Sequence, residues 1–406
     1  MKELDLKVNF LKVIFLINIL WGALAPIIIA FFAMIFSHSL IFLIKDVVFY
    51  CSFSLIFFFP NKKILVLGRL KVLFHIILFL LFLGGITLCF SNFYYWQIYN
   101  IRQLLVPFLI IAFPYVIKIQ SELNKELILF ILKLVFNLII IGGVFLIIDI
   151  WEIIDLSNYF NAKGIPTYSN GKPAMFFEPS MNYLERLVST ILDPISFGHI
   201  ITAAFVSLFF VKSLCRGKRK LYLIVFLIGL FMTFSKGAIF QLIIAVFLFN
   251  NRLNIILRVI VPFIVLVLGF FLIDLKGIII HFKGLYFSII NVNFFGHGLG
   301  LVGNYAKMFA EDLSIYKKMQ ISDTFIGSVL GQIGIIGLLV WLSFFYRYII
   351  DVVRNKMLPG SIIIVSQLVI SVLSENTLNF TSFFIPGLLA VLVNKYQLYE
   401  NSNNRN

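Results

Sequence analysis

The residues best suited to chemistry lie in one polar stretch, Glu178 to His199, of a chain that is rich in apolar residues. Arg186 is the one arginine in this stretch, and a long apolar run follows it. A charged group at the mouth of a membrane bundle costs free energy unless it is paired or hydrated, so it indicates a functional site. A guanidinium can bind a phosphate through two parallel hydrogen bonds, which an ammonium cannot. Arg186 is therefore the first candidate for binding an anionic substrate.

Two further cations are candidates for the same site. Arg102 opens another apolar run, and Lys236 lies in the tight turn Ser235-Lys236-Gly237. Each cation taken alone is also explained as an interfacial anchor. Three cations from three helices directed at one face favour a shared anion site over three anchors.

The candidate proton acceptors are Asp323, His297 and Glu178. A general base must come within hydrogen-bond reach of the group it deprotonates, and carboxylates and imidazoles are the usual choices. The five histidines show no HxxH or HExxH spacing, and the three cysteines show no CxxC pair. We therefore expect neither a metal site nor a cofactor.

A glycine run extends from Gly296 to Gly303, with Gly298 and Gly300 inside it. Its spacing matches a dinucleotide fingerprint, but that fingerprint needs a preceding strand and a βαβ unit. Here the run is predicted to lie between two membrane spans, so we exclude nicotinamide binding. The backbone N–H groups of such a loop can instead bind a phosphate. The alternative is a flexible connection.

Composition identifies a polytopic membrane protein. The chain has 406 residues, of which 61% are hydrophobic and 13% are charged, against roughly 25% charged residues in a soluble domain. Its repeated apolar stretches are long enough to cross a bilayer core about 30 Å thick, and such spans must be helical. The net charge of +15 comes from short basic clusters between apolar runs. That pattern indicates cytoplasmic loops and not a nucleic-acid interface.

The fold class that we predict is an all-α bundle of about twelve transmembrane helices. Lys and Arg concentrate in alternate short connections, such as Lys212 to Lys220, which places both termini in the cytoplasm. We expect one integral domain, residues 1–406, with two large extracytoplasmic segments at about 150–189 and 274–322. The predicted spans are about 13–36, 39–59, 70–90, 102–118, 127–149, 190–211, 221–234, 238–250, 255–273, 323–348, 360–377 and 383–394.

Taken together, these residues resemble the O-antigen polymerase and ligase family over about residues 90–350. The family includes Wzy-type polymerases of surface polysaccharides and WaaL-type ligases. The matching features, in chain order, are Arg186 with Asp193-Pro194, the turn Ser235-Lys236-Gly237, the run Gly296 to Gly303, and Ser322-Asp323 ahead of Gly334-Ile-Ile-Gly337. Lys236 stands where the family has an arginine. Ser322-Asp323 stands where it has a His-Asn pair, and the missing histidine argues against a ligase.

The resemblance implies a GT-C-like bundle in the bacterial plasma membrane, with its active site facing outward. It implies metal-independent, inverting transfer between undecaprenyl-pyrophosphate-linked glycans of a capsule, exopolysaccharide or O-antigen. Arg186, Arg102 and Lys236 would neutralise the leaving pyrophosphate. A chain-length regulator and a flippase are the implied partners, with no nucleic acid. The alternatives are a ligase and, from another class, a polysaccharide flippase. Few cations lie in mid-span, Lys45 and Lys133 being the main ones, which favours the enzyme over a flippase.

The predicted topology can be tested with reporter fusions. A phosphatase that folds only outside the cytoplasm should be active when fused near residue 165 and silent when fused near residue 218, because the basic cluster holds the second site inside. Immunoblots should show equal amounts of both fusions. The reverse pattern of activity would contradict the topology.

Overall fold

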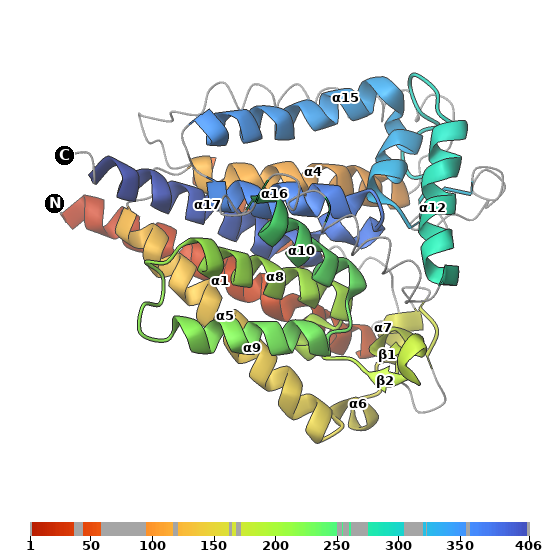
Figure 1. Cartoon of the computed structure of the whole chain (residues 1–406), viewed down its shortest axis with the longest axis horizontal. Coiled ribbons are helices and arrows are strands. Elements are labelled where there is room, and N and C mark those ends of the chain that lie inside the picture. The colour runs from red at the N-terminus through yellow and green to blue at the C-terminus, as the bar shows by residue number, and fades with distance from the viewer. Residues whose placement is uncertain are drawn as a thin grey trace. The chain divides into compact units, whose positions relative to one another are not determined.

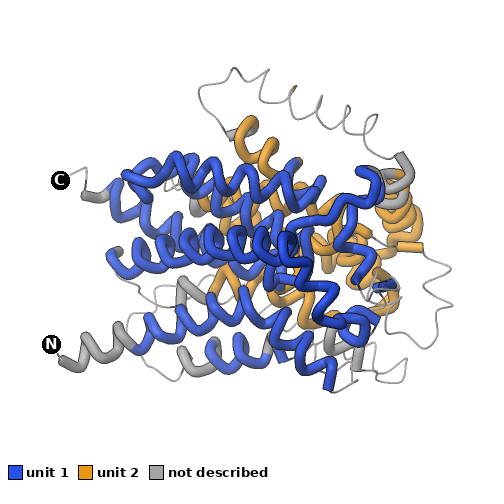
Figure 2. Tube along the Cα trace, turned by 90° about the horizontal axis from the view of Figure 1, so that it is seen from below, with its two compact units in different colours: residues 1–64, 113–239, 381–406 blue, residues 65–112, 240–380 orange. Residues whose placement is uncertain are grey.

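The computed structural model describes residues 2–35, 44–57, 95–116, 121–161, 165–167, 172–249, 254, 260, 275–303, 320–321, 323–354 and 358–403. These residues are helical apart from loops, one hairpin of two short strands and an isolated bridge between Thr167 and Pro173. The chain forms two compact units (Figure 2). Unit 1 comprises residues 1–64, 113–239 and 381–406, and unit 2 comprises residues 65–112 and 240–380.

Unit 1 is built from long helices that lie side by side (Figure 1). They are α1 (Lys2–Ile35), α2 (Ile44–Phe57), α5 (Ser121–Ile147), α8 (Pro194–Phe210), α9 (Arg219–Met232) and most of α17 (Phe380–Asn403). The described part of the first large segment that we predicted outside the membrane forms short helices and a hairpin. It contains α6 (Ile150–Ile153), α7 (Ser157–Asn161), η2 (Ala174–Phe176), β1 (Phe177–Glu178), η3 (Pro179–Met181) and β2 (Leu184–Glu185). The beginning of α1 and the end of α17 lie at the same end of unit 1 (Figure 1).

Among the described residues, three helices are long and apolar enough to cross a membrane: Phe10–Ile35, Glu122–Ile147 and Phe325–Ile350. These helices confirm the prediction of an all-α membrane protein. Shorter apolar helices are Asn100–Ala112, Pro194–Phe210, Lys236–Phe247 and Pro359–Ser371. The predicted span 70–90 lies outside the described residues, as does the predicted span 255–273 except for residue 260. The count of twelve and the orientation stay predictions.

A single 3₁₀ turn, η4 (Ser189–Ile191), holds the centre of unit 1 together. Ser189 Oγ donates to Leu138 O of α5 at 2.8 Å, and Thr190 Oγ1 donates to Ala23 O of α1 at 2.9 Å. Ser189 also lies against Gly142, where an added Cβ would come within 3.1 Å of the serine Cβ. The segment just after Arg186 is thus fixed to two long helices.

Unit 2 contains most of α4 (Tyr95–Val116) and of α10 (Lys236–Phe249), with α12 (Leu275–Ile290), α15 (Phe325–Arg354), α16 (Leu358–Ser371) and η5 (Glu375–Leu378). Its core includes Trp341 of α15, which is 1% exposed and donates from Nε1 to Leu104 O at 3.1 Å. Phe108 packs edge-on against Trp341, with ring centroids 5.3 Å apart. This aromatic contact joins α15 to α4.

Helix α15 is broken at Gly334, whose angles, φ 70° and ψ −172°, are not helical. A break removes helical hydrogen bonds, and lipid offers no replacement partners. The segment 291–303 provides them. Four backbone hydrogen bonds of 2.8 to 3.2 Å join the two segments: His297 N to Gly331 O, Gly298 N to Gln332 O, Ile335 N to Asn293 O and Ile336 N to Phe294 O.

Two glycines make this contact sterically feasible. A Cβ on Gly334 would clash with Gly296 N and Phe294 O, and a Cβ on Gly296 would clash with Gln332 O. Both glycines also have positive φ, 70° and 81°, which other residues adopt only with strain. The glycine run is therefore the structural complement of the helix break.

Gly334→Ala should destabilise the protein by about 2 kcal/mol or more, because the new Cβ meets backbone atoms at a positive φ. The matched control is Gly143→Ala in α5, where an added Cβ has no atom within 4 Å. Thermal unfolding in detergent, followed by tryptophan fluorescence, measures both. Equal midpoints for the two variants would contradict the proposed role of Gly334.

Candidate functional site

The backbone of Arg186 is held between a hairpin and the end of a helix. Strands β1 and β2 pair antiparallel, with Phe177 opposite Glu185, and Arg186 follows β2 directly. Arg186 N donates to Phe176 O at 2.8 Å, and Leu187 N donates to Met232 O at the end of α9 at 2.8 Å. The arginine is thus placed by main-chain contacts on both sides.

The guanidinium of Arg186 is turned onto the C-terminal end of α9. Nε donates to Thr233 O at 2.9 Å, and Nη2 donates to Phe234 O at 3.1 Å. Nη1 lies 3.5 Å from Met175 O. The carbonyl end of a helix carries partial negative charge, so a cation is stabilised there. Only 8% of the residue is exposed, and this burial lowers the pKa of Arg186, while the charges of Glu178 and Asp193 oppose the shift.

Glu178 joins Arg186 to Lys236. Its Oε1 lies 3.0 Å from Lys236 Nζ, and its Oε2 lies 3.9 Å from Arg186 Nη1. The side chain of Glu178 is 8% exposed, whereas that of Lys236 is 44% exposed. The three residues form one charged cluster, in which Lys236 is the member most open to solvent. Glu178 serves here as an ion-pair partner of two cations.

Lys236 is the first residue of α10, and Ser235 caps this helix. Ala238 N donates to Ser235 Oγ at 3.4 Å, and Ile239 N donates to Ser235 O at 3.0 Å. Helix N-termini favour anions, and a lysine at this position adds a full positive charge to the partial one. Gly198 of α8 lies against Ser235, because an added Cβ would come within 2.8 Å of the serine Cβ.

The Asp193-Pro194 step has a clear structural role. Asp193 Oδ1 accepts a hydrogen bond from Ile195 N at 2.9 Å, and Ser196 Oγ donates to Oδ2. Asp193 is therefore the N-cap of α8, with Pro194 in the first helical position, where its missing N–H costs nothing. This step starts the apolar helix that follows Arg186.

A second charged group fixes the other strand of the hairpin. Lys172 is 4% exposed, and its Nζ lies 2.5 Å from Asp149 Oδ1 and 3.6 Å from both Glu152 Oε1 and Glu185 Oε2. Burial disfavours the charged lysine, but the hydrogen bond that Lys172 donates to Asp149 and the neighbouring carboxylates raise the pKa of Lys172 overall. The ion pairs tie β2 to the loop and helix after α5, next to Arg186.

The remaining predicted residues belong to unit 2. Arg102 is buried in α4, at 5% exposure. Asp323 is partly buried and has a positive φ of 58°. The next residue, Thr324, caps α15, because its Oγ1 accepts a hydrogen bond from Gly327 N at 3.1 Å. Its neighbour Ser322 lies outside the described residues. The structure therefore groups Glu178, Arg186 and Lys236, and places Arg102, Asp323 and His297 in the other unit.

His297 can accept a proton at one nitrogen only. Its Nε2 lies 2.6 Å from Asn291 O, and since a carbonyl oxygen only accepts, Nε2 carries a hydrogen. The neutral ring then has its lone pair at Nδ1. A catalytic role for His297 would have to use Nδ1.

The glycine run uses its backbone amides within the protein. Besides the amides paired across the helix break, Gly300 N donates to Gln332 Oε1 at 3.1 Å and Gly303 N donates to Ile321 O at 3.1 Å. Gly296 N donates to Asn293 Oδ1. This geometry offers no support for the predicted phosphate loop, which stays a prediction.

Sequence reasoning missed Glu375. This residue is 3% exposed in η5, accepts a hydrogen bond from Ser328 Oγ at 3.2 Å and lies within 2.9 Å of a Cβ added to Gly303. It is the only charged residue between Lys356 and Lys395. An ionisable group inside an apolar segment indicates function, so the sequence did contain a signal for it.

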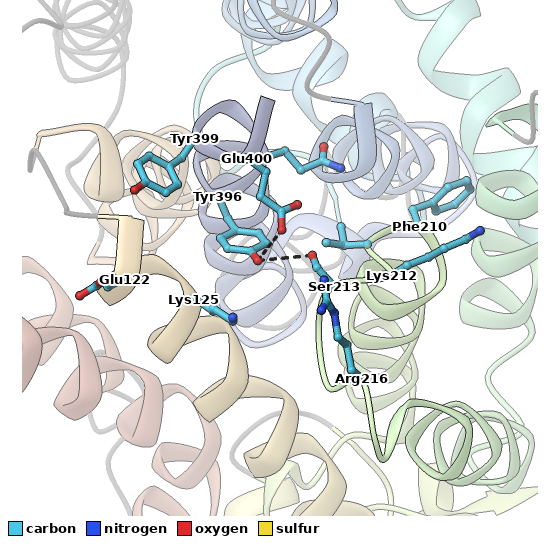
Figure 3. Close-up of a pocket in the computed structure, with 11 residues that line it drawn as sticks. Glu122, Lys125, Phe210, Lys212, Ser213, Arg216, Tyr396, Tyr399 and Glu400 are labelled. Carbon is cyan, nitrogen blue, oxygen red and sulfur yellow. Dashed lines mark hydrogen bonds between the residues drawn. The ribbon is translucent and has the colours of Figure 1, made fainter. Parts of the chain in front are cut away.

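A cavity of about 720 Å³ lies at one end of unit 1, lined by the beginning of α5, the loop after α8 and the end of α17 (Figure 3). Tyr396 donates from Oη to Glu400 Oε1 at 2.6 Å, and Lys125 and Arg216 stand to either side. None of the predicted site residues lines this cavity. Within the described part of the chain, no three His, Cys, Asp or Glu residues gather as a metal site.

Arg186→Lys should lower the free energy of unfolding by about 2 kcal/mol, because one ammonium cannot reach the carbonyls that the planar fork spans. Lys236→Ala, which removes a half-exposed ion pair, should change it by less than about 1 kcal/mol. Thermal unfolding of the purified proteins compares the two. An Arg186→Lys variant as stable as the wild type would show that only the charge matters.

Comparison with known proteins gives no family assignment. No family model matches the chain, and no curated protein matches it. The function therefore has to be argued from the residues and their geometry.

Proposed function

We propose that the protein is a polysaccharide polymerase, which joins polyprenyl-pyrophosphate-linked oligosaccharide repeat units at the outer leaflet of a bacterial plasma membrane. The observation that carries the proposal is the cluster of Glu178, Arg186 and Lys236 at the start of α10. The resemblance of the sequence to the O-antigen polymerase and ligase family supports the same assignment. The apolar helices suit a substrate with a long isoprenoid tail.

In the proposed reaction, a sugar hydroxyl of the acceptor attacks the anomeric carbon of the donor. The new glycosidic C–O bond forms while the bond between the anomeric carbon and the pyrophosphate oxygen breaks. The polyprenyl pyrophosphate leaves with the bonding electrons, and the hydroxyl proton passes to a base. Attack opposite the leaving group inverts the anomeric centre.

The three residues of the cluster have different roles in stabilising the leaving group. Lys236, exposed at the positive end of α10, contacts the pyrophosphate, where negative charge develops in the transition state. Glu178 fixes the lysine, and Arg186 fixes Glu178 and the end of α9 while adding its own positive charge. Arg102 is the further cation proposed in unit 2.

The base is proposed among the groups that the cluster does not use. Glu178 is engaged by two cations, so the candidate bases that we keep are His297, through Nδ1, and Asp323. Glu375 joins them as a buried carboxylate beside the glycine run.

One observation bears on the rival class. Transporters often contain discontinuous membrane helices, whose freed backbone groups bind substrate or ions, and α15 is broken at Gly334. Here the groups next to the break are hydrogen-bonded by segment 291–303. This favours a structural break over a transport site, and a flippase remains the alternative to be tested.

The test is to incubate purified protein in proteoliposomes with undecaprenyl-pyrophosphate-linked repeat units and to identify the product. The repeat units are extracted from cells that lack this protein. A ladder of longer lipid-linked glycans supports the polymerase. Transfer to a lipid A core acceptor would show a ligase, and movement of unchanged repeat units across the bilayer would show a flippase. Either result would overturn the proposal.

Lys236→Ala should reduce chain extension at least about a hundredfold, as expected for loss of one transition-state charge, and Lys236→Arg should restore much of it. Lys220→Ala is the control, because this exposed cation lies at the other end of α9, about 20 Å away along the helix axis. Glycan length on gels measures extension. Full activity of Lys236→Ala would exclude the lysine from the site.

A further inference from the structure

Helix α12 presents an apolar face that no described part of unit 2 covers. Five of its large side chains are between 41% and 59% exposed: Ile279, Phe282, Tyr286, Ile289 and Ile290. Their spacing of three and four residues places them on one side of the helix. Gly284 and Ser288 on the opposite side are buried, and Ser288 lies against Gly327 of α15. One face is therefore packed on protein, and the other is apolar and open.

The direction of α12 identifies what that open face meets. Within unit 2, α12 runs across the long direction of α15, a helix long and apolar enough to cross a membrane (Figure 1). A helix that crosses a span at a steep angle lies along the plane of the bilayer. With 16 residues, α12 is about 24 Å long, which is less than the bilayer core needs.

The charges of α12 fit a lipid surface. Lys283 is exposed at one edge of the apolar face. Lys283 Nζ is 5.8 Å from the centre of the Phe287 ring, so its stem lies along the helix. Cations beside an apolar stripe, together with a tyrosine, are the pattern of helices that lie in the headgroup region.

Two more large apolar side chains are exposed just after the helix. Phe294 and Phe295 are 67% and 63% exposed in the loop that follows α12. The same loop pairs with the break in α15 through Phe294 O. A second protein is a less fitting occupant, because the flanking Lys283 matches anionic headgroups and because α15, on which α12 packs, is itself a candidate span.

We propose that α12 is a membrane-surface helix, whose Ile279, Phe282, Tyr286, Ile289 and Ile290 insert between lipids while Lys283 contacts lipid phosphates. The occupant of this face is the bilayer itself, in the leaflet that faces the second large loop. The helix thereby fixes the depth of the glycine run and of the break at Gly334.

The test uses the full-length protein in nanodiscs that contain phosphatidylglycerol, with Cys51, Cys89 and Cys215 replaced by serine. A nitroxide is attached to Ile289→Cys or, as a matched control, to the exposed Lys220→Cys. Collision rates with oxygen, which enters lipid, and with a water-soluble nickel chelate are compared by electron paramagnetic resonance. Unchanged thermal midpoints show that the labelled proteins are folded.

The proposal predicts that the ratio of oxygen to nickel collisions is several-fold higher at position 289 than at position 220. Equal ratios at the two positions would overturn it, because the face would then be in water. Spin–spin broadening at position 289 that vanishes on dilution with unlabelled protein would also overturn it, since a second copy would cover the face.

Lys283 has a separate readout. Lys283→Gln should lower the number of phosphatidylglycerol molecules retained by the protein in native mass spectrometry, relative to the wild type. Lys220→Gln serves as the control for loss of an exposed charge. Retention equal to the wild type would overturn the assignment of Lys283 to lipid phosphates.

Discussion

The constraint on which this structure depends is that lipid supplies no hydrogen-bond partner, so each backbone group freed from a helix must be met by protein. Two places show how the chain does so. Carbonyl oxygens at the end of α9 accept hydrogen bonds from the guanidinium of Arg186. The backbone groups around Gly334 form hydrogen bonds with segment 291–303. In both cases a segment predicted to lie outside the membrane supplies the partner. These two segments are therefore joined to the helices at the points where helices end or break.

This constraint also explains why the two cations of the cluster differ in burial. A guanidinium with several donors can satisfy more than one carbonyl at once, which suits Arg186 at 8% exposure. A lysine has one compact charge on a flexible stem, and Lys236 keeps nearly half of its side chain exposed. Glu178 couples the two, so the position of the exposed charge depends on the buried one. A fixed and partly desolvated cation stabilises developing negative charge without reorganisation.

Local pattern predicted the parts of the fold that depend on composition. Spans expected at about 127–149 and 323–348 correspond to α5 and α15 within several residues. The break at Gly334 was not predicted, because Gly-Ile-Ile-Gly reads as an ordinary apolar helix and the break depends on a close approach by Gly296. The contacts of Arg186 with Thr233 and Phe234 escaped prediction for the same reason. They join residues that are 47 and 48 positions apart, and no local pattern encodes such a pair.

The features that resemble the polymerase and ligase family do not all carry equal weight for function. Asp193-Pro194 starts α8, Ser235 caps α10, and Gly334 allows the break in α15, so each has a structural role that accounts for its presence. Shared structural residues indicate a shared fold more strongly than a shared reaction. Lys236 differs, because a cation at a helix N-terminus is unfavourable for the helix and must be offset by Glu178. A residue that costs stability where it stands is the one whose presence a function best explains.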